Sequence, residues 1–405
     1  MSKSKVQSHG IAGKVIEHAL SVITRCDRGE ITLDDAVDTL PEDCRRIIEH
    51  LLFTFYRRRK AISRALNKFI KRPPSAEVMA LMTLAAIQCR FQSGIVPESA
   101  VNVAVDFAKT FHADKFVNAI LRNFLRSEFI QPSNPADILP GAIYRRWQKR
   151  FTRDELTELA ALFQQEAEFT CRVLPGFEAV DNSIPLEAWG NFRFVSAPAT
   201  SVIDSETLKK GGFYIQDPAT SFAVSLAADD APKAKKVLDL CAAPGGKTLM
   251  LGELCTPECR IVAADISSRR QQRTRENFML RNRKYEVITA SPDELYGQYD
   301  IILADLPCSN TGVFRKRPDA LWNFSQKKFQ EICALQKEIL KSALKLLAPG
   351  GIIIISTCSI EPEENEELVN FFCSLDPALQ CEIRQTILPS LQPDGAFAAR
   401  VRRTH

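Results

Sequence analysis

Val237-Leu-Asp-Leu-Cys-Ala-Ala-Pro-Gly-Gly-Lys-Thr248 predicts a strand that is covered on both faces and runs into a tight glycine turn and a helix start. Gly245 and Gly246 allow the backbone to come close to a ligand at the N-terminus of that helix. A second apolar run ends on Asp265, about 20 residues further along, at a spacing from which a carboxylate can hydrogen-bond ribose hydroxyls. The pattern therefore indicates a nucleoside-binding site.

Two phosphate-binding motifs fail on particular residues of this stretch. A Walker loop needs a glycine five positions before Gly246, and Cys241 stands there. A dinucleotide fingerprint needs three spaced glycines, and Cys241 and Ala243 occupy the first two of those positions. An ordinary strand, turn and helix fits these residues as well as a cofactor turn does, because Gly-Gly turns are common.

From Lys235 onward, apolar strands alternate with helical stretches, which predicts a parallel, doubly wound α/β sheet that binds ligands outside the carboxyl ends of its strands. Asp305 and Cys308 follow the fourth expected strand, and Cys358 ends the fifth. Between residue 113 and the terminal His405 there is no histidine, so cysteine and aspartate must carry any chemistry in this half. The expected strands are 236–241, 260–266, 285–290, 299–306 and 351–358.

Two cysteines beside a cofactor turn suit one kind of methyl transfer. Carbon 5 of cytosine is a poor nucleophile, but a thiolate that attacks carbon 6 turns the ring into an enamine whose carbon 5 can take a methyl group. An acid must protonate ring nitrogen 3 as the adduct forms, and a desolvated Asp305 can do so. The carbon 5 proton and the thiol must leave afterwards, so two cysteines match a reaction in two stages. Buried cysteines commonly act as inert, small apolar residues, but this role fits two cysteines at strand ends beside a cofactor site less well.

The length of the chain, 405 residues, predicts two or three domains. Apolar residues recur at helical spacing through residues 10–128, so this part is expected to be a helical bundle. Proline and small polar residues at 131–140 predict a linker, and 141–225 mixes a helical piece with short strands. The predicted divisions are therefore 1–130, 131–140, 141–225 and 226–405.

A formal net charge of +4 permits an RNA partner without requiring one. The run Arg57-Arg-Arg-Lys60, between the expected helical stretches 44–55 and 62–69, is either a solvated face or a phosphate contact. The N-terminus lacks an apolar signal core and no run of about 18 apolar residues occurs, so we expect a cytoplasmic protein with no membrane partner. The 12 scattered cysteines are expected to be reduced, and no metal is expected, because Cys255 and Cys259 form only half of a zinc site.

Asp239-Leu-Cys-Ala-Ala-Pro-Gly-Gly-Lys-Thr248 resembles the S-adenosylmethionine motif of the RsmB/Sun family of 16S ribosomal RNA cytosine-5 methyltransferases. Asp305-Leu-Pro-Cys-Ser-Asn-Thr-Gly-Val313 is similar to the Pro-Cys motif of the family, and Ser356-Thr-Cys-Ser-Ile-Glu-Pro-Glu-Glu-Asn365 to its Thr-Cys motif. Phe116-Val-Asn-Ala-Ile-Leu-Arg-Asn-Phe-Leu-Arg126 resembles the NusB-type domain that heads these enzymes. The resemblance implies an all-α NusB-like RNA-binding domain, a small α+β RNA-binding region and a C-terminal Rossmann-like methyltransferase domain.

The resemblance also implies roles for individual residues. Cys358 is the implied nucleophile, Cys308 assists product release, and Asp305 contacts the target base. Ser291 stands where the family commonly has an acid that holds the adenosine end, and Asp293 is the nearby candidate to replace it. The residues expected to hold S-adenosylmethionine are Cys241, Ala242, Ala243, Pro244, Gly245, Gly246, Lys247, Asp265, Arg270, Asp293 and Asp305.

One residue departs from the family pattern, and one further loop matches it. Asn310 stands where Gly or Ala is commoner in the family. The loop Arg315–Trp322 matches a family loop, and its cations are candidates to meet RNA phosphate, although a solvated loop explains them as well.

We therefore expect a monomeric enzyme that transfers a methyl group from S-adenosylmethionine to carbon 5 of a cytosine in 16S rRNA, either naked or partly assembled. A paired base would have to flip out, at a cost of roughly a few kcal/mol. A tRNA cytosine-5 methyltransferase with the same core and a non-catalytic RNA-binding ribosome assembly factor remain alternatives, although the second would not need both cysteine motifs. A DNA methyltransferase is disfavoured, because the Thr-Cys motif would then be unexplained.

Overall fold

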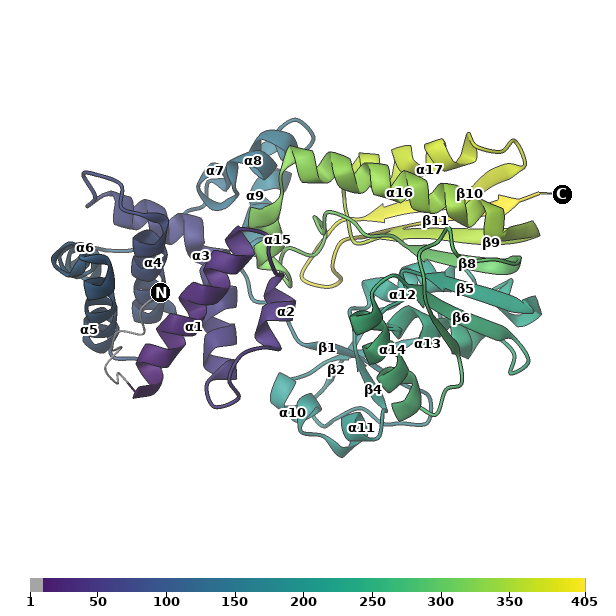
Figure 1. Cartoon of the computed structure of the whole chain (residues 1–405), viewed down its shortest axis with the longest axis horizontal. Helices are drawn as coiled ribbons and strands as arrows, with labels where there is room; N and C mark the ends of the chain where they lie inside the picture. Colours follow the sequence, from purple (N-terminus) through teal and green to yellow (C-terminus); the bar gives the residue numbers. More distant parts are fainter. Residues whose placement is uncertain (1–9, 405) are drawn as a thin grey trace. The chain divides into compact units, whose positions relative to one another are not determined.

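A computed structural model describes residues 10–404 of the chain (Figure 1). The chain divides into two units. The first consists of the residues up to Glu166 together with Phe314–Ser325, and the second of Ala167–Val313 together with the residues from Gln326 onward. No helix between residues 10 and 404 has both the length and the hydropathy that a bilayer crossing needs.

All regular elements described in the first unit are helices, which confirms the expected helical N-terminal part. The α-helices are α1 (Gly10–Asp27), α2 (Leu33–Val37), α3 (Arg45–Asn67), α4 (Ala76–Phe91), α5 (Pro97–Ala108), α6 (Asp114–Arg126), α7 (Pro135–Ile138), α8 (Gly141–Trp147), α9 (Arg153–Phe163) and α15 (Pro318–Asn323). A 3-10 turn, η1 (Lys109–Phe111), follows α5.

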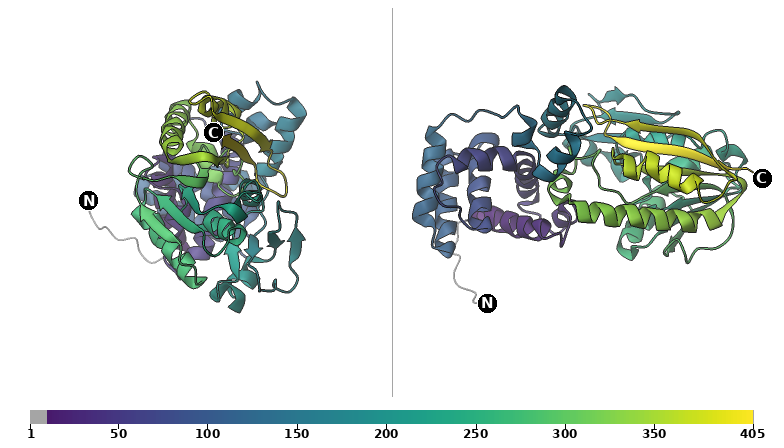
Figure 2. Two further views of the ribbon diagram at one scale, coloured as in Figure 1. Left: turned by 90° about the vertical axis from the view of Figure 1, so that its right-hand side faces the viewer. Right: turned by 90° about the horizontal axis from the view of Figure 1, so that it is seen from above.

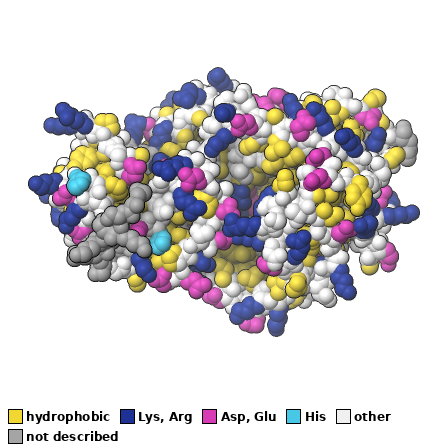
Figure 3. All heavy atoms as spheres, viewed as in Figure 1, with side chains coloured by type: hydrophobic (Ala, Val, Ile, Leu, Met, Phe, Trp, Pro, Cys, Tyr) yellow, Lys and Arg dark blue, Asp and Glu magenta, His cyan; other side chains and the backbone are white. Residues whose placement is uncertain are grey.

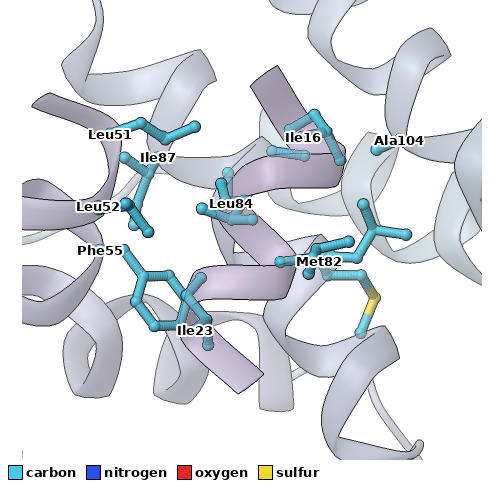
Figure 4. Close-up of a cluster of buried hydrophobic side chains, with 14 of the residues drawn as sticks. Ile16, Ile23, Leu51, Leu52, Phe55, Met82, Leu84, Ile87 and Ala104 are labelled. Atoms are coloured by element: carbon cyan, nitrogen blue, oxygen red, sulfur yellow. The ribbon is translucent and has the colours of Figure 1, made fainter. Parts of the chain in front are cut away.

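The core of this unit lies between α1, α3 and α4 (Figure 4). Full burial of one such aliphatic or aromatic side chain stabilises the fold by roughly 1.5–3 kcal/mol. The side chains that meet there, each at most 2% exposed, include Ile16, Ile23, Leu51, Leu52, Phe55, Leu84 and Ile87.

Two details of the first unit differ from the sequence expectations. The two expected stretches, 44–55 and 62–69, are joined in one helix, α3 (Arg45–Asn67), which runs through the basic residues between them. Helix α7 lies within the expected linker 131–140, because Asn134 caps its first turn by accepting a hydrogen bond from the N–H of Ala136 at 3.0 Å. The predicted domain boundaries themselves stay predictions.

The second unit begins with a small α+β part, as expected for this region. Its four strands form an antiparallel sheet in the order β2-β3-β1-β4. The elements are β1 (Thr170–Val173), β2 (Ile184–Leu186), β3 (Arg193–Ser196), α10 (Ala199–Ile203), α11 (Glu206–Lys209) and β4 (Phe213–Ile215). The strands β2 and β4 were not predicted, because each has only three residues.

The rest of the second unit is a Rossmann-like domain on a seven-stranded sheet in the order β10-β11-β9-β8-β5-β6-β7. The expected five strands are parallel, β11 pairs antiparallel with β9 of this set, and β10 pairs antiparallel with β11. The strands are β5 (Lys236–Leu240), β6 (Arg260–Asp265), β7 (Glu286–Thr289), β8 (Tyr299–Asp305), β9 (Leu347–Thr357), β10 (Leu379–Ile387) and β11 (Ala396–Arg403). The helical segments are α12 (Ala219–Ser225), η2 (Ala231–Lys233), α13 (Gly246–Leu254), α14 (Ser268–Leu280), α16 (Gln326–Leu346), η3 (Pro362–Glu364) and α17 (Glu366–Cys373).

Helices cover both faces of this sheet, which explains the almost continuously apolar strands. Successive side chains of a strand point to opposite faces. Leu238 and Ile302 accordingly pack on the face covered by α16 and α17, which lie beside each other in all views (Figures 1 and 2). Val237 and Ile301 pack on the face covered by α12 and α13. The loops at the carboxyl ends of the strands therefore rest on a rigid, buried base.

Candidate active site

The carboxyl ends of four parallel strands bring the candidate residues to one edge of the sheet. Leu240, the last residue of β5, is paired with Ala264 of β6 and with Ala304 of β8. Asp305 of β8 is in turn paired with Ser356 of β9. The glycine turn, Asp265, the Pro-Cys sequence and the Thr-Cys sequence therefore emerge next to one another, as the predicted topology requires.

The glycine turn is formed by the residues expected from the sequence. Gly245 has a φ of +94° and directly precedes Gly246, the first residue of α13. A Cβ atom on Gly245 would lie 2.8 Å from the ring of Phe278, and one on Gly246 would lie 2.7 Å from the ring of Tyr214. Both positions therefore require glycine for packing against the protein itself, in addition to any approach of a ligand.

Two side chains from distant segments fix the turn. The hydroxyl of Tyr214 in β4 donates to the carbonyl oxygen of Pro244 at 3.1 Å, and Nδ2 of Asn277 in α14 donates to the same oxygen at 2.9 Å. Neither residue was predicted, because they lie 30 and 33 positions from Pro244 and carry no motif. The turn is thus held in place by the protein's own contacts.

Asp239 lies beneath this turn and was missed as a functional residue, although the quoted motif contains it. Its side chain is fully buried, and Oδ2 accepts a hydrogen bond from Oγ1 of Thr248 at 2.6 Å. Burial raises the pKa of Asp239 to about 7, and among residues 10–404 no donor reaches Oδ1. A buried acceptor without a partner is costly, so the motif fits a ligand that supplies a donor or a positive charge.

Asp265 ends β6 with its carboxylate facing the turn. Its Oδ1 accepts from the N–H of Ser267 and from Arg270, each at 2.8 Å, and Oδ2 lies 3.4 Å from the amide nitrogen of Ala243. The side chain is 1% exposed, whereas that of Arg270 is 55% exposed. The next residue, Ile266, is 69% exposed and offers an apolar surface beside the carboxylate. A carboxylate with spare lone pairs next to such a surface is suited to a nucleoside.

The turn after β7 holds the two candidates for the adenosine end. Glu294 Oε2 accepts hydrogen bonds from both the N–H and the hydroxyl of Ser291, each at 2.7 Å. Asp293 is exposed, and a hydrogen bond from the side chain of Ser291 lowers its pKa. The assignment of Asp293 to a cofactor contact stays a prediction.

Lys247 and Asp305 form an ion pair across the edge of the sheet. Nζ of Lys247 lies 2.7 Å from Oδ2 of Asp305, and the hydroxyl of Ser356 donates to Oδ1 of Asp305 at 3.0 Å. Burial by itself would lower the pKa of Lys247, but the charge of Asp305 and the hydrogen bond to it outweigh burial and raise that pKa. Lys247 therefore keeps its proton in a site that is largely shielded from water.

The two cysteines singled out from the sequence meet at this edge. Sγ of Cys308 lies 3.2 Å from Sγ of Cys358, and Sγ of Cys358 lies 3.1 Å from Oδ1 of Asn310, which accepts the thiol hydrogen. Asn310 has a φ of +60° and donates from Nδ2 to the carbonyl oxygen of Cys308 at 3.2 Å. The hydrogen bond with Cys358, together with burial, raises the pKa of Cys308 well above its ordinary value. The two thiols thus lie in contact, and the Lys247 cation is within electrostatic reach of Cys358.

All 12 cysteines of the chain are free thiols. Cys255 and Cys259 are hydrogen-bonded to each other, and burial raises the pKa of Cys255 to about 12. Within the described part of the chain, no group of three or more His, Cys, Asp or Glu side chains is arranged to hold a metal ion.

The basic run of the first unit makes internal contacts rather than forming a solvated face. Its side chains are half-buried within α3. Burial lowers the pKa of Arg57 to about 10 and also lowers those of Arg58 and Lys60. The acceptors are the carbonyl of Arg315 for Arg57, the amide oxygen of Gln164 for Arg58, the carboxylate of Asp27 for Arg59, and the carbonyls of Ala136 and Leu139 for Lys60.

The segment Arg315–Trp322, whose cations were candidates for RNA phosphate or for a solvated loop, is packed against helices of the first unit. Oδ2 of Asp319 accepts the N–H of Leu33 at the start of α2 at 3.1 Å. Nε1 of Trp322 donates to the carbonyl of Tyr56 at 2.8 Å, and the guanidinium of Arg59 lies 4.8 Å from the Trp322 ring. Other lysine and arginine side chains are spread over the visible surface of both units (Figure 3). Residues 315–322 therefore have a structural role that the sequence did not indicate.

Comparison with known proteins identifies both parts of the chain. Residues 226–395 match the family described as 16S rRNA methyltransferase RsmB/F, and residues 17–126 match the NusB family. The ribosomal RNA small subunit methyltransferase B of Shewanella oneidensis is 36% identical over 213 residues, about half of each chain (48% of this one and 49% of that one). The protein of the same name from Cronobacter sakazakii is 25% identical over an alignment of 448 residues that covers 98% of this chain and 99% of that one.

A solved structure has the same fold along almost the whole chain. The crystal structure of PH0851 matches with a TM-score of 0.75 at 21% identity, and the match covers 98% of this chain and 100% of that one. The two matched domains occur in the order expected from the sequence, and the alignment with the Cronobacter protein runs through both. The Pro-Cys and Thr-Cys sequences of the matched methyltransferase part lie at neighbouring strand ends. Over residues 226–395 the chain therefore matches the RsmB/F family of S-adenosylmethionine-dependent ribosomal RNA methyltransferases, and a NusB-type domain at residues 17–126 precedes this part.

Proposed function

We propose that the protein methylates carbon 5 of a cytosine in 16S rRNA through a covalent adduct between Cys358 and carbon 6 of the ring. One observation carries the proposal: the thiols of Cys308 and Cys358 lie 3.2 Å apart at the ends of β8 and β9. Two thiols at one strand edge beside an ion pair match the needs of a reaction that first adds and later eliminates a nucleophile.

The cofactor would be held by the glycine turn and the strand ends beside it. The chain from Cys241 to Lys247 would surround the methionine part of S-adenosylmethionine, with Asp239 Oδ1 as the unpaired acceptor. Asp265 would bind the ribose hydroxyls, with Arg270 and Asp293 at the outer end of the site. When bound, S-adenosylmethionine supplies an electrophilic methyl group on a sulfonium.

In the first stage Sγ of Cys358 forms a bond to carbon 6, and the electrons of the carbon 5–carbon 6 double bond move through carbon 4 to ring nitrogen 3. Carbon 5 of the resulting enamine would then take the methyl group, while the sulfonium sulfur keeps the electron pair of the broken carbon–sulfur bond. The positive charge of Lys247, within electrostatic reach of Cys358, favours the thiolate that this attack needs. Asn310 restricts the rotation of the Cys358 thiol, because its Oδ1 accepts the thiol hydrogen while its Nδ2 donates to the carbonyl of Cys308. The nucleophile is therefore oriented before the base arrives.

Ring nitrogen 3 must take a proton as the adduct forms. From the sequence, Asp305 alone was the candidate acid. The ion pair supports a modified assignment, because the proton resides on Nζ of Lys247 while Asp305 is its acceptor at 2.7 Å. The Lys247–Asp305 pair would supply the proton, and the carboxylate would accept a hydrogen bond from the exocyclic amine of cytosine.

In the second stage a base takes the carbon 5 proton, the double bond between carbons 5 and 6 forms again, and the bond from carbon 6 to Sγ of Cys358 breaks with its electron pair returning to the sulfur. Nitrogen 3 then returns its proton to the Lys247–Asp305 pair. Cys308, in contact with the departing sulfur, would assist this elimination.

RNA as the substrate is supported by the RsmB/F and NusB matches. A paired target base would have to flip out at a cost of roughly a few kcal/mol, which naked or partly assembled rRNA would lower.

Methyl transfer from labelled S-adenosylmethionine tests the proposal directly. The substrates are unmodified 16S rRNA, naked and in small subunits, with tRNA in parallel, and bisulfite sequencing maps the product. Label at one cytosine of 16S rRNA is the expected result. Label on tRNA alone would keep the chemistry and replace the substrate, whereas an absence of label on every RNA would reject the enzymatic proposal in favour of an RNA-binding assembly factor.

A further inference from the structure

A buried carboxylate lies directly beneath the two cysteines and has no part in the chemistry described above. The side chain of Glu364, at the end of η3, is 0% exposed. Burial raises its pKa, and the interactions that oppose this are hydrogen bonds from Ser309 and Ser359. A buried carboxylate without a cation costs several kcal/mol unless hydrogen bonds satisfy it, so its bonds indicate what it does.

Glu364 binds the loop that carries Cys308. Oε1 accepts the backbone N–H of Ser309 at 2.8 Å, and Oε2 accepts the hydroxyl of the same residue. Nε2 of Gln336, from α16, donates to Oε1 at 3.3 Å and to the carbonyl of Pro307 at 2.8 Å. The residues on both sides of Cys308 are therefore attached, directly or through Gln336, to one carboxylate.

The same group of polar side chains continues to the loop that carries Cys358. The hydroxyl of Ser309 lies 3.3 Å from that of Ser359, the neighbour of Cys358. The Ser359 hydroxyl lies 3.0 Å from Oγ1 of Thr311 and accepts the N–H of Glu361 at 3.0 Å. The backbone N–H of Gly312 also donates to the carbonyl of Cys358 at 3.0 Å. The two cysteine loops are thus joined through a continuous buried network that has the Glu364 carboxylate at its centre.

We propose that Glu364 is a positioning residue that fixes the Ser309 loop against the Ser359 loop and so sets the spacing of the Cys308 and Cys358 thiols. This inference rests on the proposed two-cysteine reaction. Because Glu364 is completely buried and both of its oxygens are occupied by hydrogen bonds, it does not touch the substrate. It acts through geometry, and a misplacement of about 1 Å near the reacting atoms can reduce a rate by about 100-fold.

The test compares Glu364→Leu with Glu364→Gln in the full-length protein. Leucine fills the same space but leaves the N–H of Ser309 without an acceptor, whereas glutamine keeps an oxygen for that N–H and can donate to the Ser309 hydroxyl. We expect kcat for methyl transfer to fall by about 100-fold in the leucine variant, with the KM values for RNA and S-adenosylmethionine changed less than about twofold. The glutamine variant should stay within about threefold of the wild type.

A second readout measures the thiol spacing without any substrate. Dibromobimane bridges neighbouring thiols, and mass spectrometry of the digested protein identifies the bridged peptide that contains Cys308 and Cys358. The yield of this peptide should fall in Glu364→Leu and be retained in Glu364→Gln. Because bridging needs neither RNA nor cofactor, it tests Glu364 even if the wild type transfers no methyl group to RNA.

Glu367, an exposed residue of α17 three positions further along, supplies the matched controls Glu367→Leu and Glu367→Gln, which should behave as the wild type. If Glu364→Leu does not fold, as judged by thermal unfolding, Ser309→Ala removes the hydroxyl from the network and should reduce both kcat and bridging. Wild-type kcat and bridging in the variants that remove these bonds would overturn the proposal. A glutamine variant as impaired as the leucine variant would also overturn it, because charge rather than positioning would then be required.

Discussion

Sγ of Cys358 lies 3.2 Å from Sγ of Cys308, although the two residues are 50 positions apart in the chain. The contact exists because β8 and β9 are neighbours in register, with Asp305 paired to Ser356. Cys308 lies three positions after the end of β8 and Cys358 directly follows β9, so the parallel sheet brings both thiols to the same edge. The proposed division of labour between them leads to two separate predictions.

Cys358→Ala should abolish methyl transfer, because it removes the thiol that is proposed to attack carbon 6. The measurement is incorporation of label from S-adenosylmethionine into unmodified 16S rRNA. Cys373→Ala, at a cysteine of α17 away from the strand ends, is the control and should leave the rate unchanged. Turnover by Cys358→Ala at a rate near that of the wild type would reverse the assignment of the nucleophile.

Cys308→Ala should accumulate a covalent protein–RNA adduct, because the addition stage is intact while the elimination stage is impaired. Denaturing gel electrophoresis with labelled RNA should reveal a slowly migrating species that is absent from the Cys358→Ala,Cys308→Ala double variant. If the single variant methylates RNA and releases it without such a species, Cys308 has no role in release.

Loss of either member of the Lys247–Asp305 pair should reduce methyl transfer by about 100-fold or more, since general acid catalysis contributes a factor of that order. Lys247→Met removes the proton donor. Asp305→Asn removes the charge that raises the pKa of Lys247, and burial then lowers that pKa. Single-turnover rates of the two variants and of the double variant provide the measurement, with exposed Lys233→Met as control. Because the two groups act as one unit, the double variant should lose less activation free energy than the sum of the two single variants. Strictly additive losses would show that Lys247 and Asp305 act independently.

The stability of the second unit should depend on pH through Asp239. Burial raises the pKa of this acid to about 7 from an ordinary 3.8, so protonation favours the folded state. The contribution is fully present below about pH 4 and is lost as the pH rises through about 7, with a total on the order of 4 kcal/mol. Urea denaturation at several pH values should show the wild type losing free energy of unfolding relative to Asp239→Asn over this range. A difference that does not change with pH would contradict the assigned pKa.

The segment from Phe314 to Ser325 should stabilise the helical unit. Trp322→Phe removes the hydrogen bond to the carbonyl of Tyr56 and should cost about 1 kcal/mol, and Trp322→Ala should cost about 2–4 kcal/mol because it also removes packing. Hydrogen exchange should show reduced protection of α3 in both variants. Ile130→Ala, at a side chain that is 73% exposed, is the control. Unchanged protection of α3 in Trp322→Ala would show that the contact carries no stability.

Local sequence patterns determined a large part of this structure. The five parallel strands were predicted because apolar runs alternate with helical stretches, and the glycine turn was predicted because Gly245 and Gly246 allow a tight turn and a close backbone approach. The Cys308 and Cys358 sequences were placed at one edge because parallel strands end together. These inferences need only neighbouring residues and a topology, so they did not depend on side-chain contacts.

Tertiary structure alone decided the contacts between residues that are far apart in the chain. The ion pair of Lys247 with Asp305 spans 58 positions, and the contact of Asp319 with Leu33 spans 286. The sequence therefore left residues 315–322 as either a phosphate contact or a solvated loop, and only the folded structure shows their packing against the helices of the first unit. The unpaired Oδ1 of Asp239 likewise has no sequence signal, since burial and the loss of every donor depend on the complete set of neighbours. Propensity and spacing are local properties, whereas burial, charge pairing and thiol spacing exist only once the chain has folded.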